Sequence, residues 1–197
     1  MFTPAHNVAC NTVIAWAIFF SGCGLSKGAV EARSYLDTNS SRRTYLVSDS
    51  SSGTEDTISI QMLGTTSDRG GRREQEVLTI YGGQRIFGRA ITSGDRIEIV
   101  AGKSSLLTYS VRFPLEVGIQ WEDCAIEAVD TIVTLEARER RAFRIQMTSL
   151  SPKDFSHKTY WIDPMVGLIR MIDVQVQPYS YARKVVRWEL LSYNIEL

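Results

Sequence analysis

Cysteine is scarce in this chain of 197 residues, which has only Cys10, Cys23 and Cys124. Their spacing matches neither a metal-binding motif nor the framework of a disulfide-rich domain. Net charge is also absent, because 22 basic residues balance 22 acidic ones. This balance removes the broad electrostatic argument for nucleic acid or an anionic membrane as a partner. We therefore expect no nucleic-acid partner.

Histidine is almost missing as well, and His157 is the only one after residue 22. A Ser-His-Asp hydrolase would have to use it, with Ser151, Asp154 or Ser156 close by in the sequence. However, residues 152–158, PKDFSHK, read as a loop between strands and not as a nucleophile elbow. The chain is therefore expected not to be an enzyme, although a periplasmic hydrolase using His157 stays an alternative.

Cofactor and metal motifs are lacking too. The glycine pairs at 70–71 and 82–83 are not followed by Lys-Ser/Thr and a helix, as a phosphate-binding loop requires. A zinc site would have to combine His157, Cys124 and carboxylates scattered over different strands. We expect no metal and no cofactor. Cys124 alternates with Asp123 and Ala125, which predicts a buried free thiol.

Five carboxylates form an acidic run over residues 116–130: Glu116, Glu122, Asp123, Glu127 and Asp130. Paired carboxylates hydrolyse glycosides when one of them is desolvated and its pKa is raised. Nothing in the sequence indicates that any of these five is buried. The run therefore predicts a solvated edge.

What is present at the N-terminus is an apolar run, residues 13–20, VIAWAIFF. It is far shorter than the roughly 20 residues of a membrane-spanning helix, but it suits the apolar region of a secretory signal. Phe20, Ser21, Gly22 and Cys23 follow, and this order of apolar, small, small and cysteine resembles a bacterial lipobox. Small residues let the chain enter a narrow peptidase groove, and the thiol of Cys23 would take up diacylglycerol. The first 22 residues contain no Lys or Arg, which departs from the usual signal.

The lipobox resemblance implies a signal peptide over 1–22. The polar residues that follow predict a lipid-anchored tether over 23–42, and the rest of the chain is expected to form a single β-domain over 43–197. It implies a lipoprotein with palmitate-type acyl chains, held in the membrane by more than one chain. Gly24 in place of Asp after the cysteine favours the outer membrane, facing the periplasm; the inner membrane and the cell surface stay open. An unlipidated cleaved signal and a buried apolar segment are the alternatives.

After residue 40 the sequence alternates with period two and shows no helical stripe over three turns. Apolar residues alternate with polar ones over 58–62, 96–99, 107–113, 143–148, 172–177 and 186–190. Gly82-Gly83 predicts a hairpin, because both positions tolerate positive φ, and residues 48–56 and 67–74 read as loops. Roughly ten short strands predict an all-β fold: an antiparallel meander forming a curved sheet, a sandwich or an open barrel.

The central stretch, residues 113–173, carries a resemblance to a group of bacterial lipoproteins of uncharacterised function. Residues 114–121 resemble its PLxVGxxW pattern, and residues 160–169 resemble its TYWxxPxVGLI pattern from the Tyr onward. Residues 189–194, nearer the C-terminus, match ELLSYN. The similarity covers about 85 residues and departs at 138–141, where RERR replaces a Pro-Ala-Gly turn. It implies a curved β-meander on a lipid anchor and no particular activity.

Several motif residues have structural explanations or suggest a surface. Asp163-Pro164 followed by Gly167 predicts a turn. Tyr160 and Trp161 fall on opposite faces of one strand, so one fills the core and the other covers an edge or lines a groove. The possible partner surface consists of Arg138, Arg140 and Arg141 at a basic hairpin tip, together with Tyr160 and Trp161.

These observations favour a non-catalytic binding or accessory subunit of a cell-envelope assembly, with membrane contact through the N-terminal lipid and a protein partner in the envelope. The alternative is a carrier of lipid or lipoprotein resembling LolA and LolB, in which a curved sheet encloses an apolar cavity. That alternative requires a helical lid, and the sequence shows no strong helix.

Overall fold

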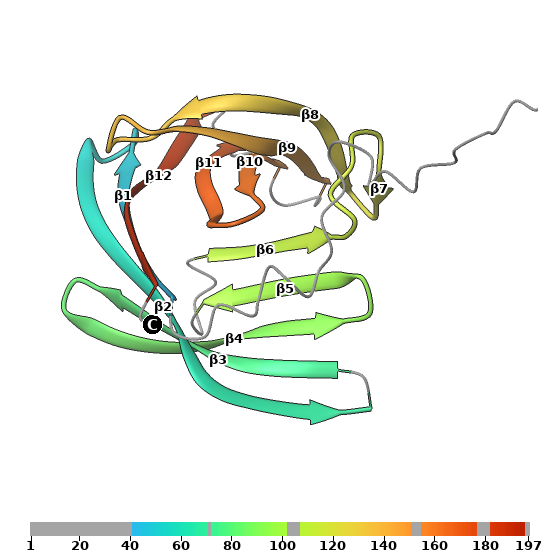
Figure 1. The fold of residues 1–197 in the computed structure, drawn as a ribbon. Helices are drawn as coiled ribbons and strands as arrows, with labels where there is room; N and C mark the ends of the chain where they lie inside the picture. Colours follow the sequence, from blue (N-terminus) through green and yellow to red (C-terminus); the bar gives the residue numbers. More distant parts are fainter. Residues whose placement is uncertain (1–40, 71, 102–106, 151–154, 177–181, 196–197) are drawn as a thin grey trace, which may run out of the picture.

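The computed structural model describes residues 41–70, 72–101, 107–150, 155–176 and 182–195, and these form strands and turns. Twelve antiparallel strands make one sheet, which confirms the predicted all-β fold (Figure 1). Within these ranges there is no helix long and apolar enough to cross a membrane. The lipobox residues Phe20, Ser21, Gly22 and Cys23 lie outside the described residues.

The strands have the following bounds: β1 Ser41–Asp49, β2 Thr54–Arg69, β3 Arg72–Tyr81, β4 Gln84–Ser93, β5 Arg96–Ala101, β6 Leu107–Arg112, β7 Gln120–Trp121, β8 Cys124–Val133, β9 Glu139–Leu150, β10 Phe155–Asp163, β11 Gly167–Val176 and β12 Arg183–Ile195.

The sheet is a meander in which the first and last strands pair with each other, while two strands from the middle of the chain are left as unpaired edges. Its order is β6-β5-β4-β3-β2-β1-β12-β11-β10-β9-β8-β7, so β1 pairs with β12 and the two edges are β6 and β7. Trp121 on β7 bridges the two edges, because its Nε1 donates to Ser110 Oγ on β6 at 3.1 Å. From β10, the Tyr160 hydroxyl also reaches β6 and donates to the Ser110 carbonyl at 2.7 Å. The Arg96 guanidinium lies 2.6 Å from the Glu122 carboxylate. The result is an open barrel.

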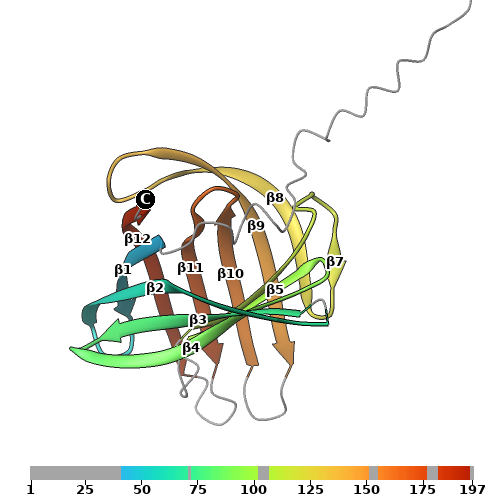
Figure 2. The ribbon, with the colours of Figure 1, turned by 60° about the horizontal axis from the view of Figure 1, so that its bottom comes forward.

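Strands β3–β5 run across the direction of β9–β11 and close the barrel on one side (Figure 2). The side chains of the inner face fill the space between them. Alternate residues of each strand point inward. The largest fully buried side chains are Tyr45, Ile58, Val77, Ile97, Val111, Leu115, Ile126, Ile145, Tyr160, Ile162, Leu168 and Ile169. They form one continuous apolar cluster.

The predicted glycine hairpin is present between β3 and β4. Gly82 and Gly83 have φ of 54° and 76°, and Tyr81 faces Gln84 across the turn. The two predicted loops are wrong in extent. Strand β2 continues to Arg69 and β3 begins at Arg72, while only residues 50–53 separate β1 from β2. Strand β1 begins at Ser41, two residues before the expected start of the domain.

The predicted turn at 163–167 is confirmed. Asp163 Oδ1 accepts hydrogen bonds from the backbone N–H groups of Met165 and Val166, at 2.7 and 3.1 Å, and Gly167 has φ of 92°. The turn lies against the start of β1, because Arg43 Nε donates to the Val166 carbonyl and the Tyr45 hydroxyl donates to the Leu168 carbonyl at 2.9 Å. It therefore covers one end of the barrel interior.

Candidate binding cavity

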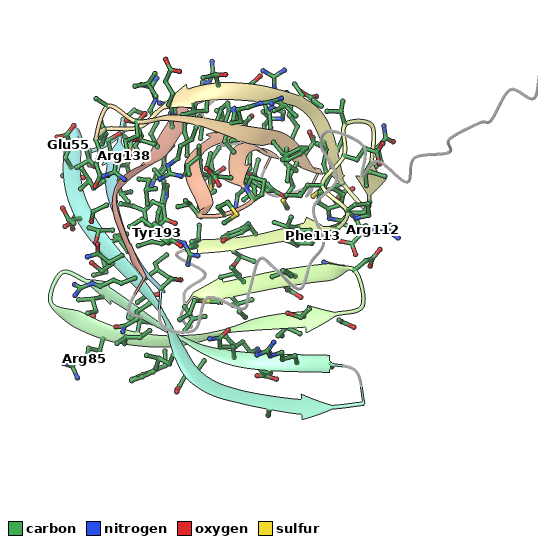
Figure 3. All side chains as sticks on the ribbon, viewed as in Figure 1. Glu55, Arg85, Arg112, Phe113, Arg138 and Tyr193 are labelled. Atoms are coloured by element: carbon green, nitrogen blue, oxygen red, sulfur yellow. The ribbon has the colours of Figure 1, made fainter. Side chains whose placement is uncertain are left out.

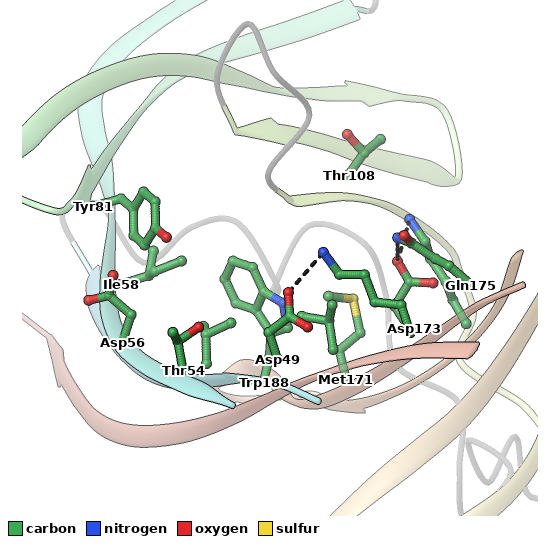
Figure 4. A pocket seen from close by; sticks show the side chains of 14 residues that line it. Asp49, Thr54, Asp56, Ile58, Tyr81, Thr108, Met171, Asp173, Gln175 and Trp188 are labelled. Carbon is green, nitrogen blue, oxygen red and sulfur yellow. Dashed lines mark hydrogen bonds and ion pairs between the residues drawn. The ribbon is translucent and has the colours of Figure 1, made fainter. Parts of the chain in front are cut away.

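A cavity of about 450 Å³ lies at the other end of the same strands (Figure 4). Its walls come from β1, β2 and β10–β12, with single residues from β3 and β6. Thr54, Asp56 and Gln175 are exposed, so the cavity reaches solvent. The lining residues are Val47, Asp49, Thr54, Asp56, Ile58, Tyr81, Thr108, Lys158, Met171, Asp173, Gln175, Lys184, Val186 and Trp188. A volume of this size is within the usual range for small-molecule sites.

The strand register places the charged lining residues in one band. Asp49 faces Val186 on β12, Val186 faces Asp173 on β11, and Asp173 faces Lys158 on β10. Directly opposite residues of an antiparallel pair share a face of the sheet. Three strands thus present charged side chains to the barrel interior in one row, with Val186 of β12 between them, and Lys184 lies in the next row, opposite Gln175.

Asp49 is held by three donors. Lys184 Nζ lies 2.8 Å from one carboxylate oxygen, and the Ser51 backbone N–H and hydroxyl donate to the other at 2.8 and 2.6 Å. The hydrogen bond from Lys184, followed by those from Ser51, lowers the pKa of Asp49 well below its ordinary value of 3.8. The carboxylate is therefore charged at neutral pH.

Asp173 is buried and equally well satisfied. It accepts hydrogen bonds from Ser156 Oγ and Gln175 Nε2, both at 2.9 Å, and Lys158 Nζ lies 3.7 Å away. A buried charge needs a partner and hydrogen bonds to be tolerated. Both carboxylates of the charged row have these, so the row is stable without any ligand charge.

An apolar floor lies next to the charged row, two residues further along each strand toward the turn at 163–167. Val47 faces Trp188, and Trp188 faces Met171. Trp188 is held in place by an edge-to-face contact with Tyr45, with ring centroids 5.9 Å apart. The cavity can therefore offer charged and amide groups on one side of a ligand and an aromatic and thioether surface on the other.

The predicted partner surface is only partly a surface. Arg138 lies exposed at the tip of the hairpin between β8 and β9 (Figure 3), and Arg141 is exposed on β9. Arg140 is mostly covered, because it forms an ion pair with Asp163 at 3.2 Å. The tip itself is residues 134–138, with Ala137 at φ 57°, so Arg140 and Arg141 belong to a strand and not to the turn.

Tyr160 and Trp161 do lie on opposite faces of β10, but neither is a free contact surface. Tyr160 is fully buried and fills the core beside Tyr109. Trp161 is buried on the outer face, where its Nε1 donates to Asp130 Oδ2 at 2.8 Å and the Arg170 guanidinium lies 5.9 Å from the ring. Both aromatic side chains are therefore corrected from partner surface to structural positions.

His157 belongs to strand β10, which begins at Phe155, and not to the predicted loop. Its Nδ1 lies 3.2 Å from Thr148 Oγ1, while the hydroxyl of Ser156 is bonded to Asp173 on the other face. Ser151 and Asp154 lie outside the described residues. The remaining members of the possible triad are thus not brought together, and the described ranges contain no cluster of three potential metal ligands.

The predicted free thiol is confirmed, since Cys124 is buried and unpaired with another cysteine. Its Sγ lies 3.7 Å from the Tyr160 hydroxyl, and burial raises the pKa of both groups. In the acidic run, Glu116, Glu122, Asp123 and Glu127 are exposed, as predicted. Asp130 differs, because Arg144 and Trp161 donate to it on the outer face.

The sequence did not reveal the cavity, because the alternation on β11 does not say which set of residues faces the interior. Ile172, Val174 and Val176 alternate with Asp173 and Gln175. The register decides between the two faces: Met171 faces the core residue Tyr160, and Asp173 and Gln175 share its face. The signal for the cavity is the recurrence of polar residues at inward positions of adjacent strands. It cannot be read from the sequence, because it requires the strand register.

This architecture defines a class: an open, twelve-stranded antiparallel meander with a cavity on its concave face. Comparison with protein-family models and with curated proteins gives no match. Among solved structures, the chain is similar to a protein from Bacteroides fragilis described as exported and as having a YmcC-like fold. The TM-score is 0.51 at 10% identity, over 79% of this chain and 96% of that one.

A protein from Parabacteroides distasonis described as a lipoprotein gives a TM-score of 0.50 at 12% identity, over 79% of this chain and 95% of that one. At these identities the likeness shows the fold alone. A lipoprotein-sorting domain from Vibrio parahaemolyticus reaches a TM-score of only 0.29, at 7% identity over 83% of this chain and 88% of that one, and carries no argument.

Proposed function

We propose that this chain is a lipid-anchored envelope lipoprotein that binds a hydrophilic ligand in its barrel cavity and does not transform it. The observation that carries the proposal is the charged row of Asp49, Asp173 and Lys158, with Lys184, beside the apolar floor. The lipobox at Cys23 supports the anchor. The shared fold of one protein described as exported and another described as a lipoprotein supports an envelope location.

The charged row favours a polar ligand over an acyl chain. An acyl chain filling the cavity would remove water from two carboxylates and two ammonium groups without replacing its hydrogen bonds, which is costly. A ligand with hydroxyl, amide or charged groups can exchange hydrogen bonds with Asp173, Gln175 and Lys158. A carrier resembling LolA and LolB therefore remains the second candidate, favoured only by the apolar floor.

We further propose that the ligand belongs to another envelope component, which makes this chain an accessory subunit and not a free-standing enzyme. The outer membrane, facing the periplasm, is the proposed location, on the basis of Gly24 after the lipobox cysteine. Membrane fractionation and intact mass of the wild type beside Cys23→Ser test this anchor. Wild type with acyl mass in the outer-membrane fraction, and a released or unprocessed variant, is the expected result.

The cavity is tested by native mass spectrometry of the full chain extracted from its membrane. We expect a bound hydrophilic species on the wild type, roughly ten- to hundredfold less of it on Asp173→Asn, and an unchanged amount on Asp130→Asn, because the loss of one charge-assisted hydrogen-bonding group costs about 1.5–3 kcal/mol. Asp130 is the matched control, since it is a bonded carboxylate on the outer face. Acyl chains in place of the hydrophilic species would select the carrier.

A further inference from the structure

Three large apolar side chains stand exposed at the barrel end opposite the cavity. Met165 is 78% exposed in the turn between β10 and β11, Val133 is 55% exposed at the end of β8, and Leu135 is 48% exposed in the turn that follows. The two turns are neighbours, because Arg140 beside the second joins Asp163 of the first by an ion pair at 3.2 Å. We call Val133, Leu135 and Met165 the apolar tip.

The chain enters the barrel beside this apolar tip. Ser41, the first residue of β1, faces Ile195, and Arg43 two residues later donates to the carbonyl of Val166, next to Met165. The Tyr193 hydroxyl, opposite Arg43, donates to the carbonyl of Met165 at 3.4 Å. Whatever precedes Ser41 therefore leaves the domain at the apolar tip.

The length of the preceding segment limits how far the tip can lie from the lipid. The segment between Cys23 and Ser41, residues 24–40, has 17 residues. Even fully extended, this segment reaches no more than about 60 Å. A lipid on Cys23 thus keeps the apolar tip close to the bilayer at a high local concentration, so that weak contacts suffice to dock it.

We propose that the apolar tip inserts into the interfacial region of the phospholipid bilayer that holds the anchor, so that the barrel stands on the membrane with its cavity facing away. This rests on the proposed lipidation of Cys23. Lys158 lies five residues before Asp163 on β10, so the charged row is about 17 Å further from the bilayer than the turn. The cavity would then meet ligands from the aqueous side.

Apolar insertion and not charge would hold the tip on the bilayer. Glu136, Arg138, Glu139 and Arg141 flank the apolar tip, and their formal charges cancel. Three side chains at the tips of two hairpins are also far fewer than the 20–30 residues that each partner contributes to a standard protein interface. Binding to a bilayer interface scales with the apolar area buried and adds to the binding of a lipid anchor, so a bilayer is the occupant that this small surface fits.

The test is the depth of single positions in the full, lipidated chain, reconstituted in vesicles of phosphatidylethanolamine and phosphatidylglycerol. An environment-sensitive fluorophore is attached at Leu135→Cys or Met165→Cys in a Cys124→Ser background. Phe87→Cys is the matched control, because Phe87 on β4 is an equally exposed apolar residue away from the tip. We expect brominated lipids to quench positions 135 and 165 roughly twofold or more above position 87, as interfacial burial requires.

The outcomes separate docking from the anchor. Lipidated protein with equal or reversed quenching overturns the docking and leaves the proposed anchor standing. Protein without acyl mass on Cys23 overturns both. Labels at 135 and 165 that stay unquenched in vesicles but are shielded in native membranes place a protein partner on the tip and overturn the bilayer. Quenching that rises steeply with the fraction of phosphatidylglycerol contradicts an apolar contact; insensitivity to it supports one.

Discussion

The two ends of the β10–β11 ladder differ sharply, although they belong to the same strands and the same inner face. Near the turn at 163–167, Tyr160, Ile162 and Leu168 are fully buried and apolar. A few residues away, the inward positions are Lys158, Asp173 and Gln175. The first end is covered by the turn and by β1, whereas the second reaches solvent. Access to water therefore decides which inward positions tolerate charge.

The difference has an energetic side. Buried apolar side chains contribute roughly 1.5–3 kcal/mol each relative to exposure, whereas partly exposed ion pairs contribute about 0–1 kcal/mol. The charged row thus adds little that packed apolar residues would not supply better. Its presence on an otherwise apolar wall is therefore a reason for the binding that we propose, and the following variants test the difference between the two ends.

The largest effect is expected at the covered end. Tyr160→Ala removes a fully buried ring beside Tyr109. It should lower the free energy of unfolding by about 3–5 kcal/mol, because the surrounding core cannot fully fill the void left by the ring. Tyr160→Phe keeps the ring and loses the hydrogen bond to the Ser110 carbonyl and the weaker contact with Cys124 Sγ, at about 1 kcal/mol or somewhat more. Urea unfolding followed by tryptophan fluorescence measures both. Equal costs for the two variants would mean that the ring packs poorly.

A smaller effect is expected at the charged end. The double variant Lys158→Met/Asp173→Leu replaces an ion pair by apolar residues of similar size and should change stability by about 1 kcal/mol or less, or stabilise. The same variant should also lose the hydrophilic ligand that we expect to detect on the wild type by native mass spectrometry. The single variant Lys158→Met is the control for the loss of the lysine alone, since Asp173 keeps its hydrogen bonds from Ser156 and Gln175 in it. A double-variant cost comparable to that of Tyr160→Ala would make the charged row a stability element.

The turns and most of the strands, at both ends of the barrel, were the predictable part of the molecule. Gly82-Gly83, and Asp163-Pro164 with Gly167, predict turns from the backbone preferences of Gly, Pro and Asp alone. Both turns are where they were expected. Period-two alternation also predicted most strands, and the pairing of sequential strands follows from short connections. Local sequence is sufficient for these features because each depends on a few consecutive residues.

The cavity was not predictable, because alternation has a period but no sign. On β11 both possible faces look plausible, and only the register with Tyr160 on β10 shows that Asp173 faces inward. The assignment of Tyr160, Trp161 and Arg140 to a partner surface was wrong for a different reason. Their partners Ser110, Asp130 and Asp163 lie 23 to 50 residues away in sequence. Such contacts arise from closure of the sheet and leave no local signal.

The smallest effect is a pH dependence in the charged row. The hydrogen bonds from Lys184 and Ser51 lower the pKa of Asp49 below its ordinary value of 3.8. Between the folded and unfolded pKa values the unfolded chain binds more protons, so stability falls as pH falls through this window. The stabilisation is complete above the unfolded pKa, at about pH 4 and higher, and disappears below the folded pKa. Asp49→Asn should therefore lower stability slightly at neutral pH and flatten its decline below about pH 4.

Urea unfolding of the wild type and of Asp49→Asn between about pH 3 and pH 6 measures this difference. Ser51→Ala removes one donor and keeps the Lys184 pair and the Ser51 backbone N–H, so its pH dependence should fall between the other two. Parallel pH profiles for all three would show that Asp49 is not held by these donors in solution. The charged row would then be looser than the covered end by more than its exposure to water explains, and the ligand itself would have to order it.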